Sequence, residues 1–166
     1  GLELVDPADM SGSLKGSRQI QQHQGTMFQD AENSIRILTS EDGLRNLREN
    51  HMDTLEEARE QGVNVQVLAP VTSNNYDHYQ ELSDVAEVRH LEEDEEVNAP
   101  EGEFSIVDDD AVTMSMTHED VHSTQDSAFW TESDHLAENT MAPVFKTLWN
   151  KSGQPEKPDD FDQPEP

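Results

Sequence analysis

The chain has 166 residues, of which 37 are Asp or Glu and only 10 are Lys or Arg, so its formal net charge at pH 7 is -27. So much like charge opposes compaction in dilute salt, but at molar salt the Debye length is about 3 Å, so the composition is typical of a protein from a halophile. Cysteine is absent, which excludes disulfides and thiolate metal sites, and no apolar run approaches the roughly 20 residues that span a bilayer.

The first half of the domain alternates between helical and strand-like patterns. A helical spacing of apolar residues follows Ser17, and the β-branched run 34–39 predicts a strand. Ser40, followed by two acids, is typical of a helix start, and this helix should end at 61–62. Residues 63–69 predict the next strand, 74–83 a short helix and 86–91 a further strand. These patterns argue against disorder for most of the chain, despite its charge.

The second half indicates a hairpin, a strand and a closing helix. Strand patterns at 104–107 and 111–116 flank an acidic turn of three Asp residues, which is a hairpin signature. Residues 127–130 predict a further strand, and an apolar stripe over 136–148 predicts a last helix. Pro143 lies within that helix and should kink it or delay its start.

We therefore expect an α/β domain, a mixed and largely parallel sheet flanked by helices, over residues 17–150. Residues 1–16 are predicted to be a lead-in, and 151–166, rich in Pro, Asp and Glu, a disordered acidic tail. Because Gly1 is not Met, we interpret the chain as a tagged protein or as a fragment of something longer. With no visible signal peptide, the expected location is the cytoplasm, with no membrane partner.

Ligands of α/β sheets usually bind beyond the carboxyl ends of the parallel strands. Those ends carry Thr39 and Ser40 after one predicted strand, and Thr72 and Asn74 after the next. Hydroxyl and amide groups there suit a sugar or polyol. The same residues also serve as helix caps and turn formers, and capping alone would explain Ser40.

Several segments, in this order and spacing, resemble the phospholipase-D-like domain of TrmB-type archaeal transcriptional regulators. The segments that carry the resemblance are 35–44, 55–70, 85–91, 103–109, 127–133 and 145–149. The likeness covers roughly residues 14–150. It implies a phospholipase-D-like fold and, in the parent protein, an amino-terminal winged-helix DNA-binding domain that is absent from this chain.

The catalytic motif of phospholipase D is His-x-Lys-x4-Asp, with the His as nucleophile and the Lys as phosphate ligand. Alignment on Phe-x-Ile-Val-Asp places Glu101 at the His position, Glu103 at the Lys position and Asp108 at the Asp position. A carboxylate repels a phosphodiester, and no imidazole remains to form the covalent intermediate. We therefore expect no enzyme activity by this route and no cofactor.

The resemblance implies a regulatory domain that binds a small-molecule effector, such as a sugar or metabolite, and forms a homodimer. The sequence has no stripe of Lys and Arg to neutralise DNA phosphates, so DNA should be contacted only through the winged-helix domain. Glu101, Glu103 and Asp108 are either the lining of a residual pocket or a loop acid, a solvent-facing strand residue and a turn former. Trp130 and Thr131 are candidates for a ligand cleft, although Trp130, like Trp149, also fits a core position.

Two other functions remain open. His118 and His122 have the spacing of a zinc pair on a helix, which would suit a metal-dependent or degenerate phospholipase-D-like hydrolase. Their segment is polar and lacks a helical stripe, which favours surface histidines in a loop. The other possibility is a dimerisation scaffold without a ligand.

Overall fold

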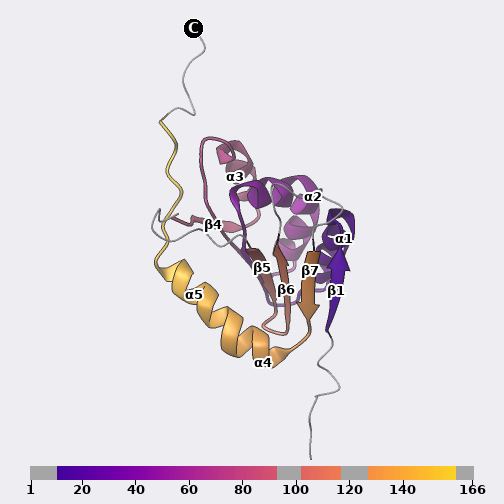
Figure 1. Cartoon of the computed structure of the whole chain (residues 1–166). Coiled ribbons are helices and arrows are strands. Elements are labelled where there is room, and N and C mark those ends of the chain that lie inside the picture. Colours follow the sequence, from indigo (N-terminus) through magenta and orange to yellow (C-terminus); the bar gives the residue numbers. More distant parts are fainter. Residues whose placement is uncertain (1–10, 93–101, 117–126, 160–166) are drawn as a thin grey trace, which may run out of the picture.

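A computed structural model describes residues 11–92, 102–116 and 127–159. Its centre is a seven-stranded sheet in the order β1-β7-β6-β5-β2-β3-β4 (Figure 1). The strands are β1 (Ser11–Lys15), β2 (Ser34–Leu38), β3 (Asn64–Ala69), β4 (Glu87–His90), β5 (Gly102–Val107), β6 (Ala111–Met116) and β7 (Ser127–Thr131). The α/β class and the mixed sheet are confirmed.

The sheet is mostly antiparallel, so the expectation of a largely parallel sheet is wrong. Only β2·β3 and β3·β4 pair in parallel, whereas β1·β7, β7·β6, β6·β5 and β5·β2 are antiparallel. Parallel pairing requires a crossover of a dozen or more residues. The helices α2 and α3 provide such crossovers between the neighbouring strands β2, β3 and β4, while a three-residue turn joins β5 to β6 and leaves no room for one.

Helices cover both faces of the sheet. The first face packs against α1 (Ser17–Gln29), α2 (Glu41–Glu60) and α3 (Tyr76–Leu82). The second packs against a continuous helical segment made of α4 (Asp134–Leu136), the π-helical turn η2 (Ala137–Met141) and α5 (Ala142–Asn150). Burial of these apolar faces holds the layers together. Among the described residues, no helix has the length and hydropathy that a bilayer crossing requires.

The end of the π-helical turn coincides with Pro143. This residue lies in the first turn of α5, where its missing N–H is tolerated. It cannot donate the backbone hydrogen bond to the preceding turn that an uninterrupted α-helix would need. The helical register changes from π to α beside Pro143, in a segment that has already begun at Asp134, so the start of the helix is not delayed as the sequence predicted. Within α5, Phe145 and Trp149 stack with ring centroids 5.6 Å apart and fill the second core.

Both ends of the domain differ from the expectation. Residues 11–15, predicted to be lead-in, form the edge strand β1 on β7. In the predicted tail, Gly153 forms a bridge to the outer edge of β4, and its carbonyl accepts the His90 N–H at 3.0 Å. The remaining described tail residues, to 159, form no helix or strand.

Candidate functional site

Polar side chains from two strands meet at the first turn of α2. Ser40 is the N-cap, and its Oγ accepts the Gly43 N–H at 3.0 Å while donating to Glu103 Oε1 at 3.0 Å. Glu103 reaches this place because β5 lies beside β2, with Phe104 opposite Leu38. Its carboxylate therefore lies at the positive end of a 20-residue helix, where a bound anion is favoured.

Gly43 leaves the space that these oxygens occupy. A Cβ built there would overlap Thr39 Oγ1 and lie 2.5 Å from Glu103 Oε1. Thr39 is itself buried at the carboxyl end of β2, and its N–H donates to the Leu68 carbonyl. Thr39, Ser40 and Glu103, which are far apart in the sequence, thus converge on one helix turn.

A cavity of about 20 Å³ lies behind this turn, between α1, α2 and the sheet. That volume holds about one water molecule, so the cavity itself cannot admit a sugar or a nucleotide. Its lining is mainly polar: Gln21, Gln24, Thr39, Asn46, His51, Glu103 and Ser105, with Ile37, Gly43 and Leu47. Any larger ligand of this edge must therefore bind at the rim or open the cavity.

His51 is the buried titratable group of the cavity. Its side chain packs edge-on against Phe28, with ring centroids 5.3 Å apart, and only 3% of the residue is exposed. Burial lowers the pKa of His51 from 6.5 to about 4, because the charged imidazolium loses its hydration. The neutral ring donates from Nε2 to Gln21 Oε1 at 2.6 Å. The sequence held a signal for it, since His51 continues the helical stripe of Leu44, Leu47 and Leu55.

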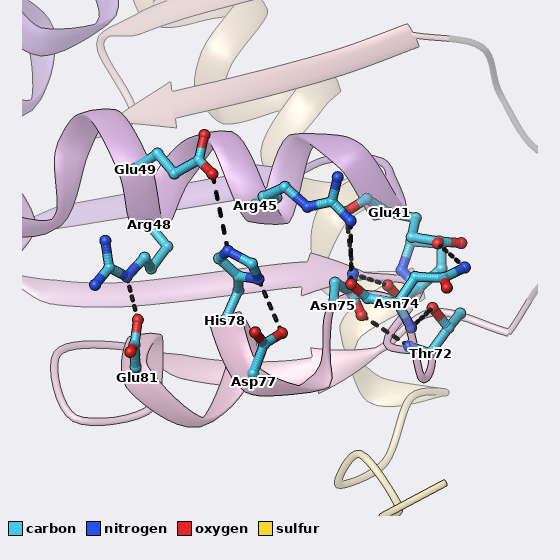
Figure 2. Close-up of polar contacts among 11 residues, drawn as sticks. Glu41, Arg45, Arg48, Glu49, Thr72, Asn74, Asn75, Asp77, His78 and Glu81 are labelled. Carbon is cyan, nitrogen blue, oxygen red and sulfur yellow. Dashed lines mark hydrogen bonds and ion pairs between the residues drawn. The ribbon is translucent and has the colours of Figure 1, made fainter. Parts of the chain in front are cut away.

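Thr72 and Asn74 lie beside the same turn of α2 (Figure 2). Asn74 Nδ2 donates to Glu41 Oε1 at 2.8 Å, and the Thr72 hydroxyl accepts the Asn74 N–H. Next to Asn74 is Asn75, which is fully buried and was not among the residues predicted for the site. Its side chain donates to the Glu41 and Pro70 carbonyls and accepts the Thr72 N–H. All its polar atoms are therefore committed to holding the β3–α3 loop on α2.

Asp108 lies at the opposite end of β5 from Glu103. Four strand residues separate the two, a distance of about 17 Å at the usual rise per residue. Asp108 and Asp109 adopt positive φ angles of 57° and 54° in the hairpin turn. The Asp108 carboxylate accepts the backbone N–H groups of residues 32, 33 and 34 at 2.7–2.9 Å. Its place is thus that of a turn former, and it does not share a pocket with Glu103.

Trp130 and Thr131 also lie away from this site, toward the Asp108 edge. Thr131 is buried and pairs with Val112 and Ser11. Trp130 packs against His23 of α1, with centroids 5.2 Å apart, and lies over Gly12, where an added Cβ would be 2.7 Å from its indole nitrogen. The indole therefore fills the gap between β1 and α1.

Three residues singled out from the sequence, Glu101, His118 and His122, lie outside the described residues. Within the described part of the chain, no three His, Asp or Glu side chains are grouped so that they could hold a metal ion.

The sequence matches no family model and no curated protein. Solved structures are similar in fold. Nuc from Salmonella typhimurium, a phospholipase D family member, has a TM-score of 0.68 at 14% identity, over 90% of this chain and 99% of Nuc. NucT from Helicobacter pylori has a TM-score of 0.69 at 11% identity, over 88% of this chain and 99% of NucT. The fold is phospholipase-D-like.

An archaeal chromatin protein with a novel mode of DNA binding, TrmBL2, has the same fold. The TM-score is 0.64 at 14% identity, over 93% of this chain. The chain spans 57% of the length of TrmBL2. Phospholipase-D-like neighbours therefore include both a phospholipase D family member and a DNA-binding chromatin protein, and the choice between these functions rests on the residues of the site.

Proposed function

We propose that this chain is a non-catalytic regulatory domain, which senses an effector and dimerises, in a TrmB-like transcription regulator of a halophilic archaeon. The observation that carries the proposal is the Glu103 carboxylate at the first turn of α2. A helix N-terminus attracts phosphate, but here a fixed carboxylate occupies the position and hydrogen-bonds Ser40. A phosphodiester would meet negative charge instead of the Lys of the catalytic motif.

Most arginines of the domain are already paired within the chain, which favours DNA contact through another part of the regulator. Five of the six have partners within the chain: Arg36 with Asp109, Arg45 with the Asn74 carbonyl, Arg48 with Glu81, Arg59 with the Asp84 carbonyl and Arg89 with the Trp149 carbonyl. Two of these contacts, from α2 to the α3 segment, appear in Figure 2. Arginines already paired are poorly placed to neutralise phosphates, so the proposal assigns DNA contact to a winged-helix domain elsewhere in the protein.

The effector that fits this edge is a neutral, hydroxyl-rich small molecule. Ser40 and Asn74 are exposed at the rim, while Thr39 and Glu103 line the cavity behind it. Together they offer hydrogen-bond donors and acceptors, and their one charge repels anions. Binding there would shift an equilibrium between dimer arrangements by its differential affinity for the two.

Thermal-shift screening in molar KCl tests the sensing role. Sugars and polyols should include a compound that raises the Tm, and phosphorylated analogues should not. Asn74→Ala should weaken the shift, whereas Asn139→Ala, an exposed asparagine on η2 with one side-chain contact, is the matched control. If no compound raises the Tm, the sensing role is refuted in favour of a dimerisation scaffold.

A further inference from the structure

One end of the sheet leaves large apolar side chains in contact with solvent. Phe104, Met114, Phe129 and Ser13 are cross-strand neighbours in one row, running from β5 outward to β1. The α5 residue Phe145 covers Phe104, with ring centroids 6.5 Å apart. Farther along the row the cover ends, and Met114 is 42% and Phe129 45% exposed. Figure 1 shows α5 on the side of the sheet away from β1 and β7.

The three strands at this end of the sheet carry no acidic residues. The sixteen residues of β1, β6 and β7 include no Asp or Glu and a single cation, Lys15. At the chain average of 37 acids in 166 residues, sixteen residues would carry about 3.6 acids. All 37 acids lie in the other 150 residues, so these strands combine exposed apolar groups with an absence of negative charge of their own.

The outer edge of β1 completes the surface. Within the described ranges, β1 is the last strand of the sheet and has β7 on one side only. Unpaired N–H and C=O groups of an edge strand are a template for another strand. Proteins often block such edges with charge, but only Lys15 stands on this one.

We propose that the surface formed by β1, Phe129 and Met114 binds a second copy of this chain, with the two β1 strands paired antiparallel across a two-fold axis. Two copies that each carry a charge of -27 approach with the least repulsion where neither presents acids, and contact at such a surface remains favourable even where salt screens the longer-range repulsion. Antiparallel strand pairing is two-fold symmetric, as an isologous dimer requires. A basic partner would instead be drawn to the acidic surfaces. This inference rests on the dimerisation proposed above and adds the surface that carries it.

Sedimentation equilibrium in molar KCl tests the surface with Phe129→Glu. The wild type should be a dimer, and the variant should dissociate with a Kd at least about 100-fold higher, because lost apolar contact and repulsion between two new carboxylates weaken association. Val144→Glu is the control, since Val144 on α5 is 46% exposed and lies outside these strands. Its Kd should match the wild type. Ser13→Glu, at an exposed edge position, repeats the test if Phe129→Glu fails to fold.

Each outcome separates the surface from the dimerisation itself. A dimeric wild type with monomeric Phe129→Glu or Ser13→Glu supports the surface. If the wild type and both folded variants dimerise equally, this surface is wrong while dimerisation stands. A wild type that stays monomeric at all concentrations overturns both.

Discussion

Acidification should destabilise the domain through His51. The unfolded chain has a His pKa of about 6.5, whereas burial holds the folded pKa of His51 at about 4. The unfolded state therefore binds more protons between these values, and stability falls as the pH falls. The pKa difference predicts a loss of about 2 kcal/mol between pH 7 and pH 5 and about 3 kcal/mol by pH 4. The contribution is fully present well above pH 6.5, and the loss levels off at about 3.4 kcal/mol once the pH is about one unit below the folded pKa.

Denaturant unfolding of the wild type and His51→Gln, followed by circular dichroism at several pH values in molar KCl, isolates this contribution from that of the carboxylates. The variant should be less stable at pH 7, because it loses the contact with Phe28. Its deficit should shrink by about 2 kcal/mol on going to pH 5, since only the wild type has the histidine to protonate. A difference that stays constant from pH 7 to pH 4 would refute the buried neutral imidazole, and an NMR titration of the ring protons checks its pKa directly.

Three further substitutions, one of them with a matched control, test the packing at the two ends of the strands by thermal or denaturant unfolding. Gly43→Ala should cost about 1–3 kcal/mol of stability despite the higher helix propensity of Ala, because the added Cβ overlaps the Thr39 and Glu103 oxygens. The control Gly153→Ala, with nothing within 4 Å of the added Cβ, should be nearly neutral. Equal effects of the two substitutions would contradict the close approach of these oxygens to Gly43. Asp108→Ala should cost about 1–2 kcal/mol, because the part-buried Ser34 N–H loses its acceptor while water can replace the exposed bonds of Glu32 and Asn33. A loss below about 0.5 kcal/mol would contradict that role. Asn75→Ala should cost about 3 kcal/mol, since the Thr72 N–H and the Glu41 and Pro70 carbonyls lose their hydrogen-bond partner. Unchanged stability would mean that water takes the place of the Asn75 side chain.

Local chemistry made the βα units of the fold predictable. Apolar alternation marked β2 and β3, and Ser40 followed by acids marked the start of α2, where it indeed caps the Gly43 N–H. The strand β1 escaped detection because Ser-Gly-Ser-Leu-Lys has little β propensity. It forms because β7 offers an edge and because Gly12 makes room for the Trp130 indole. Both are tertiary facts that no local pattern encodes.

The residues of the candidate site were predictable only where they directly follow a strand of the sheet. The rule that polar residues gather at the carboxyl ends of parallel strands placed Thr39, Ser40, Thr72 and Asn74 at one edge. Motif spacing grouped Asp108 with Glu103, but the two lie at opposite ends of β5. The burial of His51 and Asn75 depends on partners from other elements, Gln21 and Glu41. A sequence shows that a residue is polar but not which distant groups will satisfy it.

The central claim is that the Glu103 carboxylate occupies the phosphate position at α2, so that the domain does not act on phosphodiesters. The most direct measurement is hydrolysis of bis(p-nitrophenyl) phosphate and of single-stranded DNA by the purified domain in molar KCl, with and without added Zn²⁺ or Mn²⁺. The rate should equal that of the buffer for the wild type and for Glu103→Gln. Turnover above the buffer rate that Glu103→Gln abolishes would contradict it.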